Sequence, residues 1–184
     1  TKAEWCLLDG KKKKTITTQG ISPYFLTAVE IQELLEKELM PKIKNNLPTE
    51  LYYYGTGCLS TENVKLVKGA LQKVFGKIKI SVDHDLMGAA RALCGNEDGV
   101  ACILGTGSNS CYFNGKKIVK NSPGLGFILG DEGSGAYLGR KVVQHFLYNT
   151  FDPDLMDRFN AKYNSDASQI LEAVYKGPLP NRYL

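Results

Sequence analysis

Residues 100–134 read VACILGTGSNSCYFNGKKIVKNSPGLGFILGDEGS, and this stretch decides the fold. An apolar run enters the first glycine-rich turn, Gly105 to Asn109, and a second turn, Gly124 to Gly130, leads into Asp131-Glu132-Gly133-Ser134. Glycines let backbone N–H groups approach an anion closely, and Thr and Ser hydroxyls add hydrogen-bond donors. We therefore interpret the first turn as a phosphate loop and the second as a substrate loop.

Neither turn matches a common nucleotide-binding pattern. The P-loop pattern needs a Lys after its last glycine, and the dinucleotide fingerprint has a different spacing from Gly124, Gly126 and Gly130. On these patterns alone, plain tight turns explain both stretches better than a binding role does. An internal repeat favours the functional interpretation.

The repeat appears when Thr1 is aligned with Thr106 without a gap. The matched positions are Cys6 with Cys111, Asp9-Gly10 with Asn114-Gly115, and Lys11-Lys12 with Lys116-Lys117. Each half thus predicts an apolar strand, a two-residue type I′ hairpin turn and a basic return strand. The repeat also predicts a glycine before Thr1, so we expect the chain to be cut at the front of its first loop.

Composition limits the classes of function. The 184 residues are 43% hydrophobic and carry a net charge of +4, enough for a substantial core and too little charge for a strongly basic surface. The run Lys11–Lys14 falls on a predicted hairpin strand without interleaved aromatic residues, which favours a solvated edge over a nucleic-acid patch. No apolar run is long enough to span a membrane.

The five cysteines include no C-x-x-C pair, which argues against a zinc site and for a reducing compartment. Cys94, Cys102 and Cys111 lie among apolar residues, and we expect all three to be buried.

Strands and helices alternate through the first half. After a hairpin over residues 3–18, a capping box at Thr27 begins a helix that should end near Pro41. Strands over 51–54 and 78–82 flank a helix that starts at residue 60 or 61 and ends at Gly76, which is the pattern of a parallel α/β unit. Later helices are expected from Ser134 to about Asn149, from Asp152-Pro153, and over 165–175.

Asp85 follows the strand over 78–82, at its carboxyl end, where α/β folds commonly place catalytic and binding residues. As an N-cap, Asp83 or Asp85 would accept hydrogen bonds from the N–H groups of the next helix. As a general base, one of the two carboxylates would take a proton from a substrate hydroxyl as it attacks a phosphoryl group. One can cap while the other reacts, and the residues leave both interpretations open.

These residues resemble the sugar kinases of the actin-like ATPase superfamily, and within it the N-acetylglucosamine kinases and the BadF/BadG/BcrA/BcrD ATPase family. The residues that carry the resemblance are Thr1-Lys2, Gly20-x-Ser22-Pro23, Asp85 with Gly88-Ala89-Ala90, Gly105 to Asn109, and Gly124-Leu125-Gly126 through Gly130 to Ser134. The resemblance covers almost the whole chain. It implies an α/β fold of two ribonuclease-H-like halves with an interdomain cleft, residues 1–95 and 96–184, in a chain that is incomplete at both ends.

The resemblance also implies a role for each matching residue. Asp85 would be the catalytic base. The ATP phosphates would contact Thr1, Gly105, Thr106, Gly107 and Ser108. The sugar would contact Ser22, Asn109, Gly124, Leu125, Gly126 and Asp131. A carboxylate that helps to hold Mg²⁺ would precede Thr1. Leu125 stands where mammalian-type kinases have Trp, so an aromatic platform for the sugar ring is absent.

The function that these roles imply is ATP-dependent and Mg²⁺-dependent phosphorylation of an N-acetylated amino sugar, N-acetylglucosamine to its 6-phosphate. The expected partner is this small-molecule sugar, with no nucleic acid or membrane; a homodimer is left open, and the expected location is the cytoplasm. Three alternatives remain: an activator ATPase of the same family, a non-catalytic sensor of sugar or nucleotide, and an α/β scaffold with incidental glycine turns.

Overall fold

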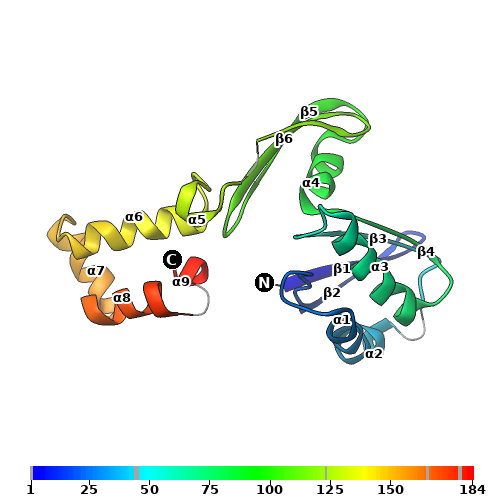
Figure 1. Ribbon diagram of the computed structural model, residues 1–184, viewed down its shortest axis with the longest axis horizontal. Helices are drawn as coiled ribbons and strands as arrows, with labels where there is room; N and C mark the ends of the chain where they lie inside the picture. Colours follow the sequence, from blue (N-terminus) through cyan, green and yellow to red (C-terminus); the bar gives the residue numbers. More distant parts are fainter. Residues whose placement is uncertain (1, 44–45, 123, 165, 178–179) are drawn as a thin grey trace. The chain divides into compact units, whose positions relative to one another are not determined.

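A computed structural model describes residues 2–43, 46–122, 124–164, 166–177 and 180–184 (Figure 1). The chain divides into two compact units, Thr1–Gly88 and Ala89–Leu184. The division lies within a helix, α4, that spans Asp85–Cys94, and the boundary expected at residue 95 lies just after that helix. The architecture is mixed α/β, as the alternating pattern predicts.

The first unit contains two small sheets and the helices that pack on them (Figure 1). Its elements are β1 (Lys2–Asp9), β2 (Lys12–Gln19), α1 (Ala28–Leu34), the π-helical turn η1 (Leu35–Leu39), α2 (Met40–Ile43), β3 (Glu50–Gly55), α3 (Thr61–Phe75) and β4 (Lys79–His84). Strands β1 and β2 pair antiparallel, whereas β3 and β4 pair parallel. The parallel pair with its crossover helix confirms the predicted strand–helix–strand unit.

The turn of the β1–β2 hairpin differs from the prediction. The register pairs Asp9 with Lys12, so the two loop residues are Gly10 and Lys11 rather than Asp9 and Gly10. Gly10 has φ +56°, and Lys11 is not among the residues with positive φ. A type I′ turn needs positive φ at both loop residues, whereas a type II′ turn needs it at the first alone. The hairpin is therefore confirmed, but its turn is not of the predicted type I′ kind.

The helix that begins at the Thr27 capping box ends at Ile43, two residues after Pro41, near which its end was predicted. Pro41 lies inside α2, directly after η1. In η1 the Met40 N–H donates to the Leu35 carbonyl, a wider turn than the α-helical one. This wider turn precedes the residue that has no N–H to donate, and the chain remains helical through Ile43.

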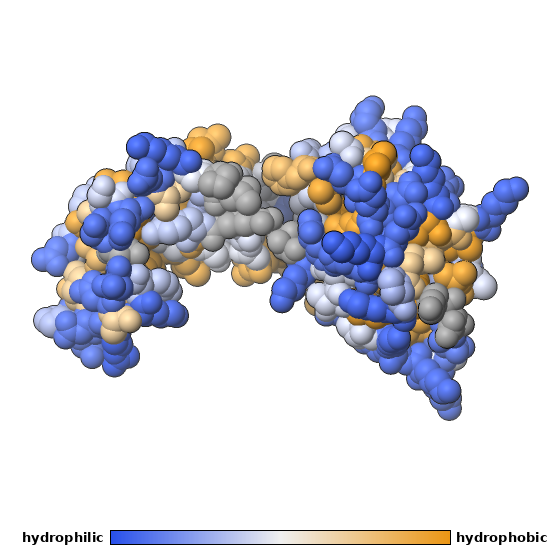
Figure 2. Space-filling view, turned by 90° about the horizontal axis from the view of Figure 1, so that it is seen from below, coloured by the Kyte–Doolittle hydropathy of each residue, from blue (hydrophilic) through white to orange (hydrophobic). Residues whose placement is uncertain are grey.

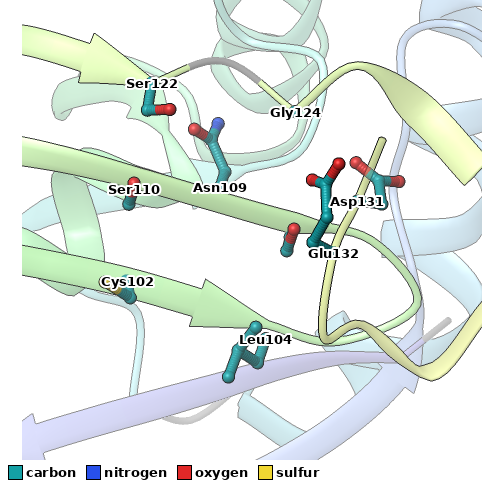
Figure 3. A pocket seen from close by; sticks show the side chains of 9 residues that line it. Cys102, Leu104, Asn109, Ser110, Ser122, Gly124, Asp131 and Glu132 are labelled. Carbon is teal, nitrogen blue, oxygen red and sulfur yellow. The ribbon is translucent and has the colours of Figure 1, made fainter. Parts of the chain in front are cut away.

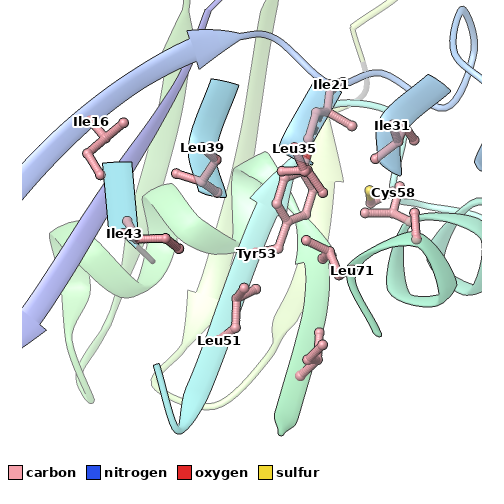
Figure 4. Packing of buried hydrophobic residues seen from close by; sticks show 13 residues of the cluster. Ile16, Ile21, Ile31, Leu35, Leu39, Ile43, Leu51, Tyr53, Cys58 and Leu71 are labelled. Carbon is pink, nitrogen blue, oxygen red and sulfur yellow. Dashed lines mark hydrogen bonds between the residues drawn. The ribbon is translucent and has the colours of Figure 1, made fainter. Parts of the chain in front are cut away.

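The core of the first unit lies between these helices and the two sheets (Figure 4). Its fully covered side chains come from the helices and include Ile31, Leu35, Val67 and Leu71, each 0% exposed. Tyr53 joins them from β3, and its ring lies 6.1 Å from that of Trp5. Side chains from the helices and from both sheets therefore form one core.

The second unit begins within α4 and contains a three-stranded antiparallel sheet followed by helices (Figure 1). Its further elements are β5 (Asp98–Leu104), β6 (Ser108–Asn114), β7 (Ile118–Ser122), α5 (Gly126–Leu129), α6 (Gly135–Leu147), α7 (Pro153–Tyr163), α8 (Ala167–Lys176) and α9 (Pro180–Tyr183). Strand β6 is the middle strand. It pairs with β7 through the predicted hairpin, but the Asn114 N–H donates to the Lys117 carbonyl over 3.1 Å, so the turn lies at Gly115 and Lys116 rather than at Asn114 and Gly115. The Asn114 side chain accepts from the N–H groups of Lys116 and Lys117.

The helices of this unit begin as their sequences predict, with side-chain caps at Ser134, Asp152 and Asp166. Phe146 of α6 packs against Phe159 of α7, with ring centroids 4.3 Å apart. Many other large apolar side chains of both units are exposed, and Figure 2 shows orange surface among the blue. Within the described ranges, no helix combines the length and apolarity needed to cross a bilayer.

The prediction for the cysteines is right for one of three. Cys111 is buried, Cys94 is half-buried, and Cys102 is exposed. The alternation along β5 explains the difference, because Ala101 faces the core and Cys102 faces the other side of the sheet.

Candidate functional site

The predicted phosphate loop connects β5 to β6 and is attached to the start of α6. The Gly105 N–H donates to the Gly107 carbonyl over 2.9 Å. The first amides of α6 reach back to the loop: the Gly135 N–H donates to the Gly105 carbonyl over 2.8 Å, and the Ala136 N–H to the Thr106 carbonyl over 3.3 Å. The loop therefore has a fixed shape, with the Thr106 and Ser108 side chains as its hydroxyl groups.

Asp131 links this loop to the predicted sugar loop. It is 9% exposed and has a left-handed backbone, φ 58°, which is uncommon for a residue with a side chain. One carboxylate oxygen, Oδ1, accepts from the Gly126 N–H over 3.2 Å. A Cβ at Gly107 would lie 2.7 Å from Oδ2, and one at Gly124 would lie 2.9 Å from Oδ1. The two loops thus meet around one nearly buried carboxylate.

A cavity of ≈ 320 Å³ opens beside Asp131 (Figure 3). Its lining residues are Cys102, Leu104, Ser108, Asn109, Ser110, Ser122, Gly124, Asp131 and Glu132. In Figure 3 the side chains of Asp131 and Glu132 extend next to each other beside Gly124. The volume falls within the range of small-molecule sites, and the lining combines hydroxyl, amide and carboxylate groups with apolar surface. Such a lining suits a polyhydroxylated ligand.

Asn109 contributes an acceptor that lacks a partner. Its Oδ1 is buried, and no hydrogen bond to it is found among the described residues. A buried carbonyl oxygen without a donor costs free energy unless a ligand or water supplies one. Ser22 in the first unit is similar, because its buried Oγ has no partner within the described ranges.

Three of the six residues predicted to bind the sugar line this cavity: Asn109, Gly124 and Asp131. Gly126 does not line the cavity, but its N–H donates to Asp131, which does. Leu125 does not line it either, and its side chain is 61% exposed. The predicted phosphate contacts Gly105, Thr106, Gly107 and Ser108 form the adjoining loop, and Ser108 also lines the cavity. Thr1 lies outside the described residues.

Asp85 lies in the first unit, at the carboxyl edge of the β3–β4 sheet, and begins α4. Its Oδ1 accepts from the Leu86 N–H over 2.9 Å, and its Oδ2 accepts from the Thr56 hydroxyl over 2.8 Å. The neighbouring Asp83 accepts from the His84 N–H over 2.9 Å. Asp85 therefore makes a local helix-start hydrogen bond and keeps lone pairs for a further donor.

The two carboxylates also affect buried groups behind this edge. Burial, and after it the negative charges of Asp85 and Asp83, raise the pKa of the Cys58 thiol to about 11. Burial is also the main cause that raises the pKa of Tyr53, with smaller effects from Cys58 and Asp85. Both groups stay protonated at neutral pH, so the acidic side chains carry the negative charge here.

Comparison with known proteins gives one curated relative and a solved structure of high similarity. N-acetyl-D-glucosamine kinase of Dictyostelium discoideum is 33% identical over 101 residues, which cover 50% of this chain and 32% of that protein. A crystal structure from Porphyromonas gingivalis, provisionally named N-acetylglucosamine kinase, matches 99% of this chain with 40% identity and a TM-score of 0.93. The chain resembles N-acetylglucosamine kinases in sequence and in fold. No family model matches it.

These matches leave part of each known protein uncovered. The chain spans 65% of the solved structure and about a third of the curated relative that it matches. The similarity supports a sugar kinase role and a phosphotransferase activity at a coarse level. The specific substrate, product and partners belong to the proposal below.

Sequence reasoning did not single out Ser110, Ser122, Cys102 and Glu132 as cavity residues. The strand register explains three of them, because Cys102 pairs with Ser110 and Ser110 pairs with Ser122 across the sheet. A two-residue turn at Asn114-Gly115 would pair Ser110 with Val119 rather than with Ser122, so the turn signal could not have found this pair. Glu132 follows Asp131 in a motif that the sequence analysis quoted but to which it gave no second role.

The described residues do not gather three or more His, Cys, Asp or Glu side chains around a point where a cation could bind. Mg²⁺ that serves phosphoryl transfer is usually held by substrate phosphates, water and one or two carboxylates. The acidic cavity residues Asp131 and Glu132 are compatible with such a weakly protein-bound ion. No dedicated cage is needed for it.

Proposed function

We propose that this protein phosphorylates an N-acetylated amino sugar with ATP, converting N-acetylglucosamine to its 6-phosphate. The observation that carries the proposal is the position of Asp131, a nearly buried carboxylate between the predicted phosphate loop and the predicted sugar loop. It lines a cavity that also presents hydroxyls, an amide and a second carboxylate beside the apolar Leu104. The similarity to N-acetylglucosamine kinases supports the same substrate class.

Phosphoryl transfer requires positioning and charge stabilisation more than covalent chemistry from the protein. In the proposed reaction the backbone and hydroxyl groups of residues 105–108, with Thr1, hold the ATP phosphates. Asp131 and Asn109 orient the sugar through its hydroxyl and amide groups. Asp85 accepts the proton of the attacking hydroxyl. Mg²⁺, when bound with ATP, neutralises charge on the phosphates.

The proposal extends to the fold. Two ribonuclease-H-like halves of the actin-like ATPase kind would each supply one glycine-containing hairpin to the nucleotide phosphates. The hairpins β1–β2 and β6–β7 occur at the positions that the internal repeat relates, one in each unit. All five cysteines are free, which fits a reducing location such as the cytoplasm.

The test measures ADP release by the full-length protein with ATP and Mg²⁺ against a panel of sugars that includes N-acetylglucosamine, glucosamine and glucose. Asp85→Asn should lower turnover about 10²- to 10⁴-fold, the usual effect of removing a general base. Asp83→Asn is the matched control, because it removes a carboxylate two residues away. ATP hydrolysis without sugar dependence would indicate an activator ATPase, and sugar binding without turnover would indicate a sensor.

A further inference from the structure

Thr56 is a residue that the proposed function does not yet use, although it contacts the proposed base directly. Its Oγ1 donates to Asp85 Oδ2 over 2.8 Å. The hydrogen bond joins residues 29 positions apart in the chain, so neither local sequence accounts for it. The parallel register brings them together. Gly55 pairs with His84 at the ends of the two strands, and Thr56 and Asp85 are the residues that directly follow them.

The geometry restricts the Asp85 carboxylate from two sides. The Leu86 N–H holds Oδ1 at 2.9 Å, and the Thr56 hydroxyl holds Oδ2 at 2.8 Å. With one donor on each oxygen, rotation about the bond to the carboxylate would break at least one of the two hydrogen bonds. Each oxygen still has a second lone pair, so the carboxylate can accept a further proton donor.

The loop that carries Thr56 is itself held in place. Gly57 has φ +83°, and a Cβ there would lie 2.9 Å from the Tyr24 ring and 3.1 Å from Pro23. The Gly57 carbonyl accepts from Asn63 Nδ2 of α3 over 2.8 Å. These contacts restrict the backbone directly after Thr56, the residue whose hydroxyl donates to Asp85.

The second carboxylate at this edge has a different partner. Asp83 Oδ1 accepts from the His84 N–H over 2.9 Å and lies 3.8 Å from His84 Nε2. The Thr56 hydrogen bond therefore distinguishes Asp85 from Asp83.

We propose that Thr56 is a positioning residue that aims the Asp85 carboxylate at the substrate hydroxyl. The inference rests on the proposed function, because it takes Asp85 as the base. A misdirected base slows proton removal in the transition state while leaving the binding of sugar and ATP nearly unchanged. A purely structural hydrogen bond between two strand ends would instead change stability and leave turnover per folded molecule as it is.

The experiment uses the full-length protein with Thr56→Val, which keeps the shape and removes the donor, and Thr56→Ser, which keeps the donor. We expect Thr56→Val to lower kcat for sugar-dependent ADP release about tenfold, with KM for sugar and for ATP within about twofold of wild type. Thr56→Ser should stay within about twofold of wild type. Thr49→Val, at an exposed position just before β3, controls for the same substitution elsewhere in the unit.

A double-mutant cycle tests whether Thr56 acts through Asp85. Thr56→Val added to Asp85→Asn should cost no further activity, since the group that it positions is already absent. Undiminished kcat in Thr56→Val, equal losses in the Val and Ser variants, or additive losses in the double variant would each overturn the inference while the kinase assignment stands. Wild-type protein without sugar-dependent turnover would overturn both. Thermal melting of each variant gives the folded fraction by which kcat is divided.

Discussion

Gly107 and Asp131 are in contact such that a single added carbon would not fit: a Cβ at Gly107 would lie 2.7 Å from Asp131 Oδ2. Gly107 belongs to the turn after β5, and Asp131 follows α5. The contact therefore couples the loop proposed to hold phosphates to the carboxylate proposed to hold the sugar. A change in one of these loops should therefore alter the binding of the ligand that the other loop contacts.

Gly107→Ala should separate these two groups. Because the new methyl group would meet the carboxylate rather than the end of a flexible chain, either Asp131 or the loop must move. We expect kcat/KM for the sugar to fall about 10- to 100-fold, the usual effect of misplacing a binding group by around 1 Å. Steady-state ADP release at varied sugar concentration measures it.

Gly69→Ala provides the matched control for Gly107→Ala. Gly69 lies inside α3, and a Cβ there would meet nothing within 4 Å. The substitution should leave activity unchanged and stabilise the protein by about 0.5–1 kcal/mol, because Ala favours a helix over Gly. If both alanines reduced kcat/KM equally, the steric explanation for Gly107 would be wrong.

The cavity can be tested by chemical labelling without any activity measurement. Cys102 is exposed and lines the cavity, whereas Cys6 is exposed on β1 in the other unit. Saturating N-acetylglucosamine should slow the alkylation of Cys102 several-fold by covering the thiol, and it should leave the rate at Cys6 unchanged. Mass spectrometry of peptides after timed exposure to a maleimide gives both rates. Equal rates at Cys102 with and without sugar would place the sugar elsewhere.

The capping box at Thr27 should contribute measurably to the stability of the first unit. The Glu30 N–H donates to Thr27 Oγ1 over 3.3 Å, and the Thr27 N–H donates to Glu30 Oε2 over 2.8 Å. This cap starts the helix that carries Ile31 into the core. Thr27→Ala should lower the free energy of unfolding by about 1 kcal/mol, and Thr27→Ser should retain most of it. Urea unfolding followed by the fluorescence of Trp5 measures both.

Local signals in the sequence predicted the elements well, because the physics of helix ends and hairpins is local. The caps at Thr27, Ser134 and Asp152 satisfy amides within three residues, so a short stretch contains all the needed information. The predictions failed where a second local effect intervened. In the β1–β2 hairpin, the strand register moved the turn by one residue.

The site was predicted in part, for a related reason. Asp131 and Gly107 were recognised within their own motifs, but their contact depends on how the turn after β5 packs against the turn after α5. The pairing of Thr56 with Asp85 depends on the register of two parallel strands, which no short stretch specifies. Long-range contacts of this kind follow from the fold and not from the motif.

Cys58 should make the stability of the first unit depend on pH in the alkaline range. The thiol is 2% exposed, and burial, followed by the charges of Asp85 and Asp83, raises its pKa from about 9 to about 11. Between these two values the unfolded chain loses the proton while the folded chain keeps it. The folded state then binds more protons, so stability falls as pH rises.

The expected loss between pH 9 and pH 11 is on the order of 2 kcal/mol, from the pKa difference. Burial of Tyr53 raises its pKa as well, so this residue adds to the loss above about pH 10. Urea unfolding at several pH values measures the dependence. Cys58→Ala should start from a lower stability and show a shallower slope between pH 9 and pH 10, where the tyrosine contributes little. Tyr53→Phe should keep that part of the slope and flatten the region above it. An unchanged slope in Cys58→Ala would show that another group titrates in this range.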